Sequence, residues 1–290
     1  MKPCQRCSGI SYVLASVCGL GLVIQTSGSQ PDGFQLEPII TQYAETVSRI
    51  TLDLNFSVFE DAQLQEADDL SGYGASFELV VPFLERFQIR LAYPAYTQAN
   101  GTYRKAGNPL DGSPIEVEGN TGFFDFPTAI LDYQFLGVKR DEGWNAAGFA
   151  GVGYSIGNLE TSVGDIFNHK GYYAVMGLKA DSELNERWRL AGNFAARYYW
   201  ASDDIHPEGG DVFWLWDLSA AVIYKPEFKQ IYPVLELLYQ GDFDLYNTVQ
   251  LAPELIVPFC RHFELKVAFP VGLTSDGERW STQIQGTVLF

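Results

Sequence analysis

The stretch that decides the fold class closes the chain: Trp280-Ser-Thr-Gln-Ile-Gln-Gly-Thr-Val-Leu-Phe290. Trp280, Ile284, Val288 and Phe290 fall at alternate positions, and Ser, Gln and Thr fill most of the positions between them. Successive side chains of a β-strand point to opposite faces. The alternation therefore predicts one long strand with an apolar face and a mainly polar face.

The same period of two recurs about a dozen times along the chain. Residues 187–200, for example, place Trp188, Leu190 and Phe194 on one face and Arg189 on the other. Most of these runs are longer than the ~5–6 residues of a soluble strand and match the ~9–11 that cross a bilayer. The predicted strands are 48–59, 73–83, 87–97, 123–136, 145–156, 171–180, 187–200, 212–224, 231–240, 248–259, 263–271 and 280–290.

The predicted connections alternate between long and short, as in outer-membrane barrels with long outer loops and short periplasmic turns. Aromatic residues near strand ends, such as Tyr198, Trp200 and Trp214, fit interfacial girdles. We therefore expect an all-β fold, a closed transmembrane antiparallel up-and-down β-barrel of about twelve strands over residues 48–290, in the outer membrane of a Gram-negative-type envelope. The long connections are 60–72, 98–122, 157–170, 201–211, 241–247 and 272–279, and the short ones are 84–86, 137–144, 181–186, 225–230 and 260–262.

The first 29 residues read as a secretory signal peptide. Lys2 and Arg6 precede an apolar run from residue 10 to residue 24, and small residues follow, so cleavage is expected after Gly28 or Ser29. Three of the four cysteines would leave with this segment. Cys260 then stands alone, which excludes an intramolecular disulfide and a cysteine metal cluster.

Residues 30–47, between the signal and the barrel, have apolar residues at helical spacing, among them Leu36, Ile40, Tyr43 and Val47. This spacing predicts a short amphipathic helix. The segment either plugs the lumen or lies on the periplasmic rim. The rim is preferred, because so short a segment is poorly suited to seal a wide pore.

An internal repeat supports the barrel. Residues 78–94 (Glu-Leu-Val-Val-Pro-Phe-Leu-Glu-Arg-Phe-Gln-Ile-Arg-Leu-Ala-Tyr-Pro) align without gaps to residues 254–270 (Glu-Leu-Ile-Val-Pro-Phe-Cys-Arg-His-Phe-Glu-Leu-Lys-Val-Ala-Phe-Pro). Each copy reads as strand, tight turn and strand, so one hairpin design occurs twice. We interpret the repeat as structural.

The closing strand also resembles the signature that the barrel-assembly machinery recognises, through Trp280, Ile284, Gly286, Val288 and the terminal Phe290. Residues 254–273, the Pro-Val-Gly-Leu-Thr-Ser-Asp run at 270–276 and residues 125–135 resemble the outer-membrane transporter family grouped with the meta-pathway of phenol degradation. The family's Pro-Thr-Gly segment is missing near residues 155–160, and Phe124-Asp125 replaces a Gly-Asp pair. The resemblance implies a barrel that passes small hydrophobic or aromatic molecules, and it carries over no catalytic residue and no cofactor.

Ionisable residues on the predicted inward faces are the candidate lumen and solute-path residues. Buried charges must be paired or wetted, so these residues either close the lumen with acid–base ladders or line a water-filled constriction. We hypothesise that Arg90, Arg189 and Arg197 line part of the path. The whole set is Asp53, Glu78, Arg90, Asp132, Arg189, Arg197, Asp217, Glu236 and Glu254, with Glu264 and Lys266 beside them.

The net charge of −17 excludes a nucleic-acid binder, which needs basic residues. The predicted outer loops are acidic, either as ordinary solvated surface, which we prefer, or as a mouth that attracts cations and the divalent ions bridging lipopolysaccharide. Expected partners are therefore outer-membrane lipid and lipopolysaccharide, the assembly machinery and a small-molecule solute.

Enzymatic readings find little support among the three histidines. Asp203, Asp204 and His206 fall close together in one loop, but spacing alone defines no activated water. No metal-binding motif is found. We expect a passive channel for small molecules, with a closed structural or adhesive barrel as the alternative and a loop-borne hydrolase as a distant third.

Overall fold

Within the residues that it describes, the computed structural model has fifteen β-strands and no helix that is long and apolar enough to cross a bilayer. The described residues are 35–64, 67–105, 115–124, 127–137, 143–155, 160–161, 171–201, 212–228, 230–244 and 247–290. The strands are β1 (Thr51–Leu64), β2 (Ala67–Phe83), β3 (Phe87–Lys105), β4 (Ile115–Phe124), β5 (Thr128–Leu136), β6 (Trp144–Ser155), β7 (Glu160–Thr161), β8 (Gly171–Asn185), β9 (Trp188–Ala201), β10 (Val212–Tyr224), β11 (Tyr232–Gly241), β12 (Asn247–Cys260), β13 (Phe263–Ala268), β14 (Val271–Gly272) and β15 (Trp280–Leu289).

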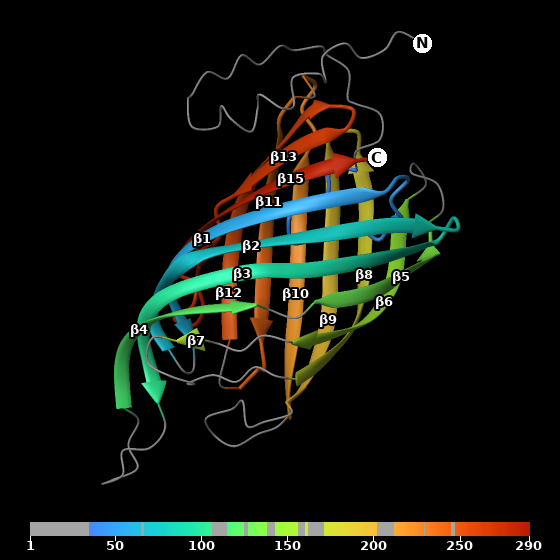
Figure 1. Cartoon of the computed structure of the whole chain (residues 1–290). Helices are drawn as coiled ribbons and strands as arrows, with labels where there is room; N and C mark the ends of the chain where they lie inside the picture. Colours follow the sequence, from blue (N-terminus) through green and yellow to red (C-terminus); the bar gives the residue numbers. More distant parts are fainter. Residues whose placement is uncertain are drawn as a thin grey trace.

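These strands form one closed antiparallel barrel (Figure 1). Most strands pair with a sequence neighbour, β6 pairs with β8, β1 pairs with β15, and the pairing of β2 with β3 completes the ring. The two-residue β7 pairs only with β4 among the described strands. β4 and β5 pair with successive halves of β3, and β13 and β14 both lie between β12 and β15. Each of these two sets therefore takes the place of a single strand in the ring. The ring thus has twelve positions, which confirms the expected barrel.

Several predicted boundaries were wrong, because strand pairing continues beyond the apolar runs. Residues 60–72 and 98–122, expected as loops, are largely the outer ends of β1 to β4. The expected turn at 181–186 is mostly the end of β8, so Asp181 belongs to the wall. The predicted strand 263–271 breaks at Phe269-Pro270, since proline has no N–H for the ladder.

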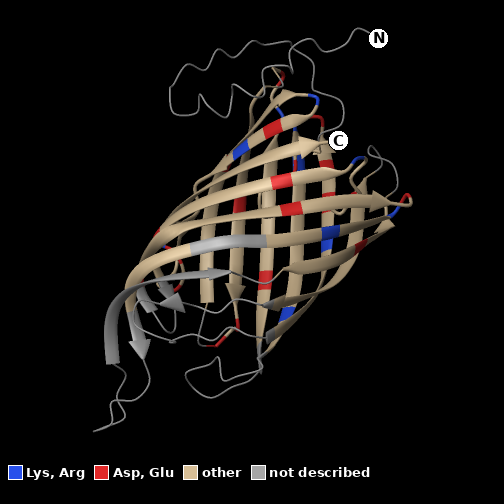
Figure 2. Cartoon of the chain, viewed as in Figure 1, with Lys and Arg blue, Asp and Glu red and all other residues tan. Residues whose placement is uncertain are grey.

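The inside and outside of the barrel follow the predicted alternation. On β11 the burial of successive residues alternates, with Val234, Glu236 and Leu238 buried and Leu235 and Leu237 exposed. Charged residues are few along the ribbons of Figure 2, and most of the wall is uncharged. An exposed face of Leu, Phe, Tyr and Trp on a closed barrel is stable where lipid replaces water. The outer face is therefore the lipid-facing surface.

Residues 35–50 contain no helix, so the predicted amphipathic helix was wrong. The segment also lies inside the barrel and not on its rim, since Leu36, Thr41 and Tyr43 are at most 1% exposed against inward side chains. The physical reason is that the N–H groups of residues 39, 41, 46 and 47 donate to side chains of the wall instead of to carbonyl oxygens of a helix. Leu36 has a positive φ of 57°, which a helix excludes.

The two ends of the barrel domain lie together. The N–H of Phe290 donates to the carbonyl oxygen of Ile50 at 3.0 Å, which joins the start of β1 to the end of β15. An even number of strand positions requires this arrangement. It places the short turns and the lumenal segment at one end, which is the periplasmic end by the usual asymmetry of such barrels. Residues 1–34, including the proposed signal, lie outside the described residues.

Candidate functional site in the lumen

One side of the lumen is neutralised by a buried ion-pair network. The guanidinium of Arg90 on β3 lies 2.7 Å from Asp132 on β5 and 3.7 Å from Glu78 on β2. Lys179 on β8 binds the other oxygen of Asp132 at 2.8 Å. Both cations also face the ring of Phe149, at 5.5 and 5.3 Å from its centre. Such a cluster is stable because every buried charge has a partner.

A second network joins the wall to the lumenal segment. Arg189 on β9 lies 2.9 Å from Asp181 on β8 and 3.3 Å from Glu45 of the segment. Its guanidinium stacks on the ring of Tyr43 at 3.7 Å. Asn145 on β6 donates to both oxygens of Asp181. Arg189 therefore helps to hold the segment by charge and by a cation–π contact.

The opposite side of the lumen carries an excess of carboxylates. Glu236 on β11, Glu254 on β12 and Glu264 on β13 are at most 2% exposed. Lys266 lies 3.4 Å from Glu264, and Asp53 on β1 accepts a hydrogen bond from Thr287 at 2.5 Å. Within the described residues, neither Glu236 nor Glu254 forms an ion pair with a basic side chain. These acids need another source of stabilisation.

Backbone amides of the segment supply part of that stabilisation. The N–H of Thr41 donates to Glu236 Oε2 at 2.6 Å, and the N–H of Ile39 donates to Glu254 Oε2 at 3.1 Å. On the far side, the N–H groups of residues 46 and 47 donate to Gln134 Oε1 (3.0 Å) and Gln88 Oε1 (2.9 Å). The segment thus bridges opposite walls of the lumen.

Two apolar side chains anchor the segment in a socket on the inner wall. Leu36 and Tyr43 are 1% exposed and belong to one buried cluster with residues of β9 to β12 and β15. The Tyr43 hydroxyl donates to the carbonyl oxygen of Leu36 at 3.0 Å. The wall residues of the cluster are Ala191, Ala221, Ile223, Tyr232, Val234, Ile256 and Leu289.

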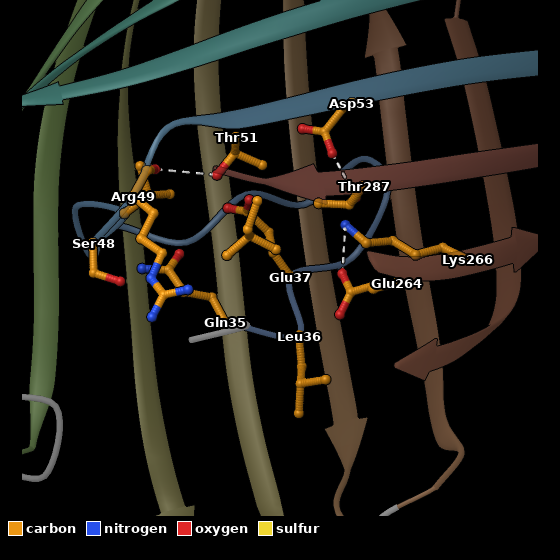
Figure 3. Close-up of a pocket in the computed structure, with 12 residues that line it drawn as sticks. Gln35, Leu36, Glu37, Ser48, Arg49, Thr51, Asp53, Glu264, Lys266 and Thr287 are labelled. Carbon is orange, nitrogen blue, oxygen red and sulfur yellow. Dashed lines mark hydrogen bonds and ion pairs between the residues drawn. The ribbon is translucent and has the colours of Figure 1, made fainter. Parts of the chain in front are cut away.

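A small pocket lies where the segment meets β1, β13 and β15 (Figure 3). Glu37 and Arg49 of the segment border it, with Asp53, Glu264 and Lys266 of the wall. Burial raises the pKa of Glu37 to about 6, although the nearby lysines oppose the increase. Burial also raises the pKa of Tyr43 well above its ordinary value, with Arg189 opposing it. While residues 35–50 occupy the lumen, the Tyr43 hydroxyl therefore keeps its proton at neutral pH, and the Glu37 carboxyl loses its proton only near pH 6.

The outer part of the lumen is wetter. Arg197 on β9 lies 2.6 Å from Asp217 on β10, and these side chains are 33% and 22% exposed. An apolar patch of Ile130, Tyr173, Val175 and Ala195 lies on the neighbouring inner wall, with Phe149 and Tyr199 packed against it. The Tyr173 and Tyr199 rings stack at 5.3 Å. The outer part of the lumen therefore combines an aromatic patch with a partly exposed ion pair.

The structure brings the sequence-derived candidates to the lumen side of the barrel. Arg90, Asp132, Arg189, Glu236 and Glu254 are buried there, and Asp53, Glu78, Arg197 and Asp217 are half-buried. Sequence reasoning missed Lys179, Asp181 and the segment residues that complete the networks. Lys179 lies within the predicted strand 171–180, and alternation places it inward with Val175. Asp181 would have joined them, had the strand been extended past residue 180. Asp203, Asp204 and His206 lie outside the described residues.

The closing strand presents its apolar positions outward. Trp280, Ile284 and Phe290 are 41%, 40% and 67% exposed, while Ser281, Gln285 and Thr287 are buried on the lumen side. Gly286 and Val288 share the outward face. The residues of the proposed assembly signature are thus accessible from the lipid side.

Comparisons with known proteins agree with the architecture. No family model and no curated protein matches the chain. An outer-membrane channel from Pseudomonas putida F1 is similar in structure, with a TM-score of 0.51, 13% identity, and coverage of 89% of this chain and 99% of that one. The β-domain of the Bordetella autotransporter BrkA has a TM-score of 0.50 and 14% identity, covering 83% and 99%. The KdgM porin covers 83% and 99% at 10% identity, with a TM-score of 0.45.

The fold is that of an outer-membrane β-barrel. The closed ring of twelve positions and the lipid-facing outer surface agree with the two barrels of highest similarity named above. At 13% and 14% identity the likeness is one of fold. What the lumen does must be argued from its own residues.

Proposed function

We propose that this barrel is a passive outer-membrane channel for small molecules, whose periplasmic exit is narrowed by residues 35–50. The observation that carries the proposal is the division of the lumen. Its outer part has half-buried polar residues such as Arg197 and Asp217, whereas its periplasmic part is crossed by the segment. A lumen with a partly exposed polar entrance, crossed at its other end by a segment that is not part of the wall, suits controlled passage better than a sealed scaffold.

The inward charges would select the solute. In this proposal Asp53, Glu78, Arg90, Asp132 and the other candidate residues line the path, and their ion pairs set its width and field. The apolar patch around Tyr173 and Tyr199 favours solutes with a hydrophobic or aromatic part, as the resemblance to the phenol meta-pathway family implies. Transport here requires no catalytic residue.

Planar-bilayer recording of the purified protein tests the proposal. We expect small, discrete conductance steps for the full chain and larger steps after deletion of residues 35–47, because the deletion removes the bridge across the lumen. A Leu36→Ala, Tyr43→Ala variant serves as a second opening variant if the deletion disturbs folding. Heat-modifiable mobility on gels confirms that each variant is folded.

The experiment can also overturn the proposal. Absence of conductance from both the full chain and the folded opening variants would favour the closed structural or adhesive barrel. The buried Arg90–Asp132–Lys179 network favours that alternative, since it already fills part of the interior. Alanine at Arg90, Arg189 and Arg197 together, with conductance and selectivity unchanged, would exclude these residues from the path.

We propose further that the chain is exported behind residues 1–29 and inserted among lipid and lipopolysaccharide by the barrel-assembly machinery. The outward positions of the closing strand support this, because the terminal Phe290 is 67% exposed. Removal of Phe290 should lower the amount of folded protein in outer-membrane fractions. An unchanged amount would reject the proposed signature, and removal of Asp203, within the connection predicted at residues 201–211, serves as a control.

A further inference from the structure

The carboxyl groups of Glu236 and Glu254 form a buried pair at the centre of the segment's seat. They stand on adjacent strands and are 0% and 2% exposed. One oxygen of each accepts a segment amide, from Thr41 and Ile39 respectively. The other oxygen, Oε1, receives no hydrogen bond from a described residue. Glu236 is paired with Ala252 and Glu254 with Val234, so the two buried side chains are diagonal neighbours on the inner face of the wall.

Two adjacent buried carboxylates cannot both ionise at ordinary cost, since burial and like charge both oppose it. The arrangement with residues 35–50 inside the lumen is therefore favoured when the pair of carboxyl groups carries a proton. Carboxyl groups in contact with water are ionised at neutral pH.

The surrounding basic side chains do not neutralise both carboxyl groups. Lys266 on β13 faces Glu254, but it is within 3.4 Å of Glu264 and is also influenced by Asp53 and Glu37. Besides Glu236, β11 contributes Tyr232, which is neutral at ordinary pH, and the wall of β10 contributes Ala221 and Ile223 to this socket. From the segment, Tyr43 is paired with Arg189, as is Glu45. The carboxylates outnumber the cations on this side.

We infer that Glu236 and Glu254 form a proton-controlled latch that holds residues 35–50 across the lumen and releases them as the pH rises. Opening of the channel by this latch rests on the proposed function, whereas release of residues 35–50 from the wall does not. The seated state binds more protons than the released state, so raising the pH favours release. The released fraction should grow by up to about tenfold per pH unit for each proton lost.

The test measures exposure of the segment directly. In the full chain, Thr41→Cys is combined with Cys260→Ser, and the rate of reaction with a water-soluble maleimide is measured between pH 6 and pH 10. The same measurement is made with Glu236→Gln and Glu254→Gln added, which keep an acceptor for each amide but remove the titration. The ratio of the two rates cancels the thiol's own dependence on pH.

We expect this ratio to rise with pH by tenfold or more over the range. A flat ratio would overturn the latch, as would a ratio that changes with the concentration of sodium or calcium at fixed pH, which would indicate a bound cation instead of a proton. If the double variant does not fold, Glu254→Gln alone removes the like-charged pair and serves the same comparison.

Conductance recorded on the same variants separates the two proposals. A rising ratio in a barrel that never conducts would leave the latch standing and reject the channel. Conductance with a flat ratio would leave the channel standing and reject the latch.

Discussion

The hairpins β2–β3 and β12–β13 share a sequence pattern but have different electrostatic surroundings. At corresponding positions the first carries Glu78 and Arg90, and the second carries Glu254 and Lys266. Arg90 lies within 3.7 Å of Glu78. In the second hairpin the corresponding acid forms no ion pair with Lys266 among the described residues and accepts a segment amide instead.

The difference arises from the strands beside each hairpin. β5 places Asp132 opposite Gln88 of the first hairpin, so Arg90 gains a second anion. β15 places Gln285 opposite Lys266, which adds no charge, while the second hairpin has an extra acid in Glu264. In the first hairpin the charges are thus neutralised by side chains of the wall, whereas in the second hairpin an acidic side chain is stabilised by the lumenal segment. The segment is anchored where the wall has spare acceptors.

The largest effect is expected from Asp132→Ala, which would leave the first hairpin with an excess of positive charge, as the second has an excess of negative charge. It leaves Arg90 and Lys179 buried without their shared anion, at a cost of about 3–5 kcal/mol in the free energy of unfolding. Urea unfolding in lipid vesicles measures it. Asp217→Ala is the matched control, and because its pair with Arg197 is partly hydrated we expect about 1 kcal/mol. Equal losses would contradict the assignment of a dry network.

The next effect concerns the segment's two attachments. Leu36→Ala empties the socket beside the second hairpin and should weaken seating by about 2 kcal/mol or more, roughly a thirtyfold rise in labelling of Thr41→Cys. Val47→Ala, at the first hairpin, trims a half-buried side chain but keeps its N–H bond to Gln88, so we expect only a few-fold rise, on the order of 0.5 kcal/mol. The reverse order would show that the first hairpin is the main anchor.

Exchanging the charge that distinguishes the lumen-facing sides of the two hairpins sharpens the comparison further. Gln88→Glu sets a carboxylate directly opposite Asp132 and should destabilise the barrel by about 1–2 kcal/mol. Glu264→Gln keeps an acceptor for Lys266 and lowers the acid excess, so we expect a change below about 1 kcal/mol. Unfolding in urea checks both. Similar losses from the two exchanges would mean that the surroundings of the hairpins do not matter.

The smallest effect concerns pH and Glu37. Its pKa is raised from 4.5 to about 6 in the seated segment, so its contribution to seating is complete below pH 4.5 and is lost as the pH rises through 6. Between pH 5 and pH 7 the labelling of Thr41→Cys should rise roughly eightfold more than in a Glu37→Gln protein. If the labelling rate changes with pH in the same way in both proteins, Glu37 does not contribute to the pH dependence.

Much of the wall was predictable from the sequence, and most of its contacts were not. Alternation placed Arg90, Asp132 and Glu236 inward, because side-chain direction in a strand depends only on local position. Which of them pair depends on register between strands, as with Lys179 of β8 and Asp132 of β5, separated by β6. The end of β8 was missed because its last residues are polar. Pairing with β6 and β9 keeps them in the sheet.

The lumenal segment shows where local sequence reasoning ends. Leu36, Tyr43 and Val47 have helical spacing, yet their backbone is extended and bent, since the wall offers carboxylate and amide acceptors that a helix would leave unused. A closed barrel with lipid outside and polar residues inside follows from the two-residue period alone. Which charges meet, and where the segment lies, follows only from the folded chain, because those contacts join residues far apart in the sequence.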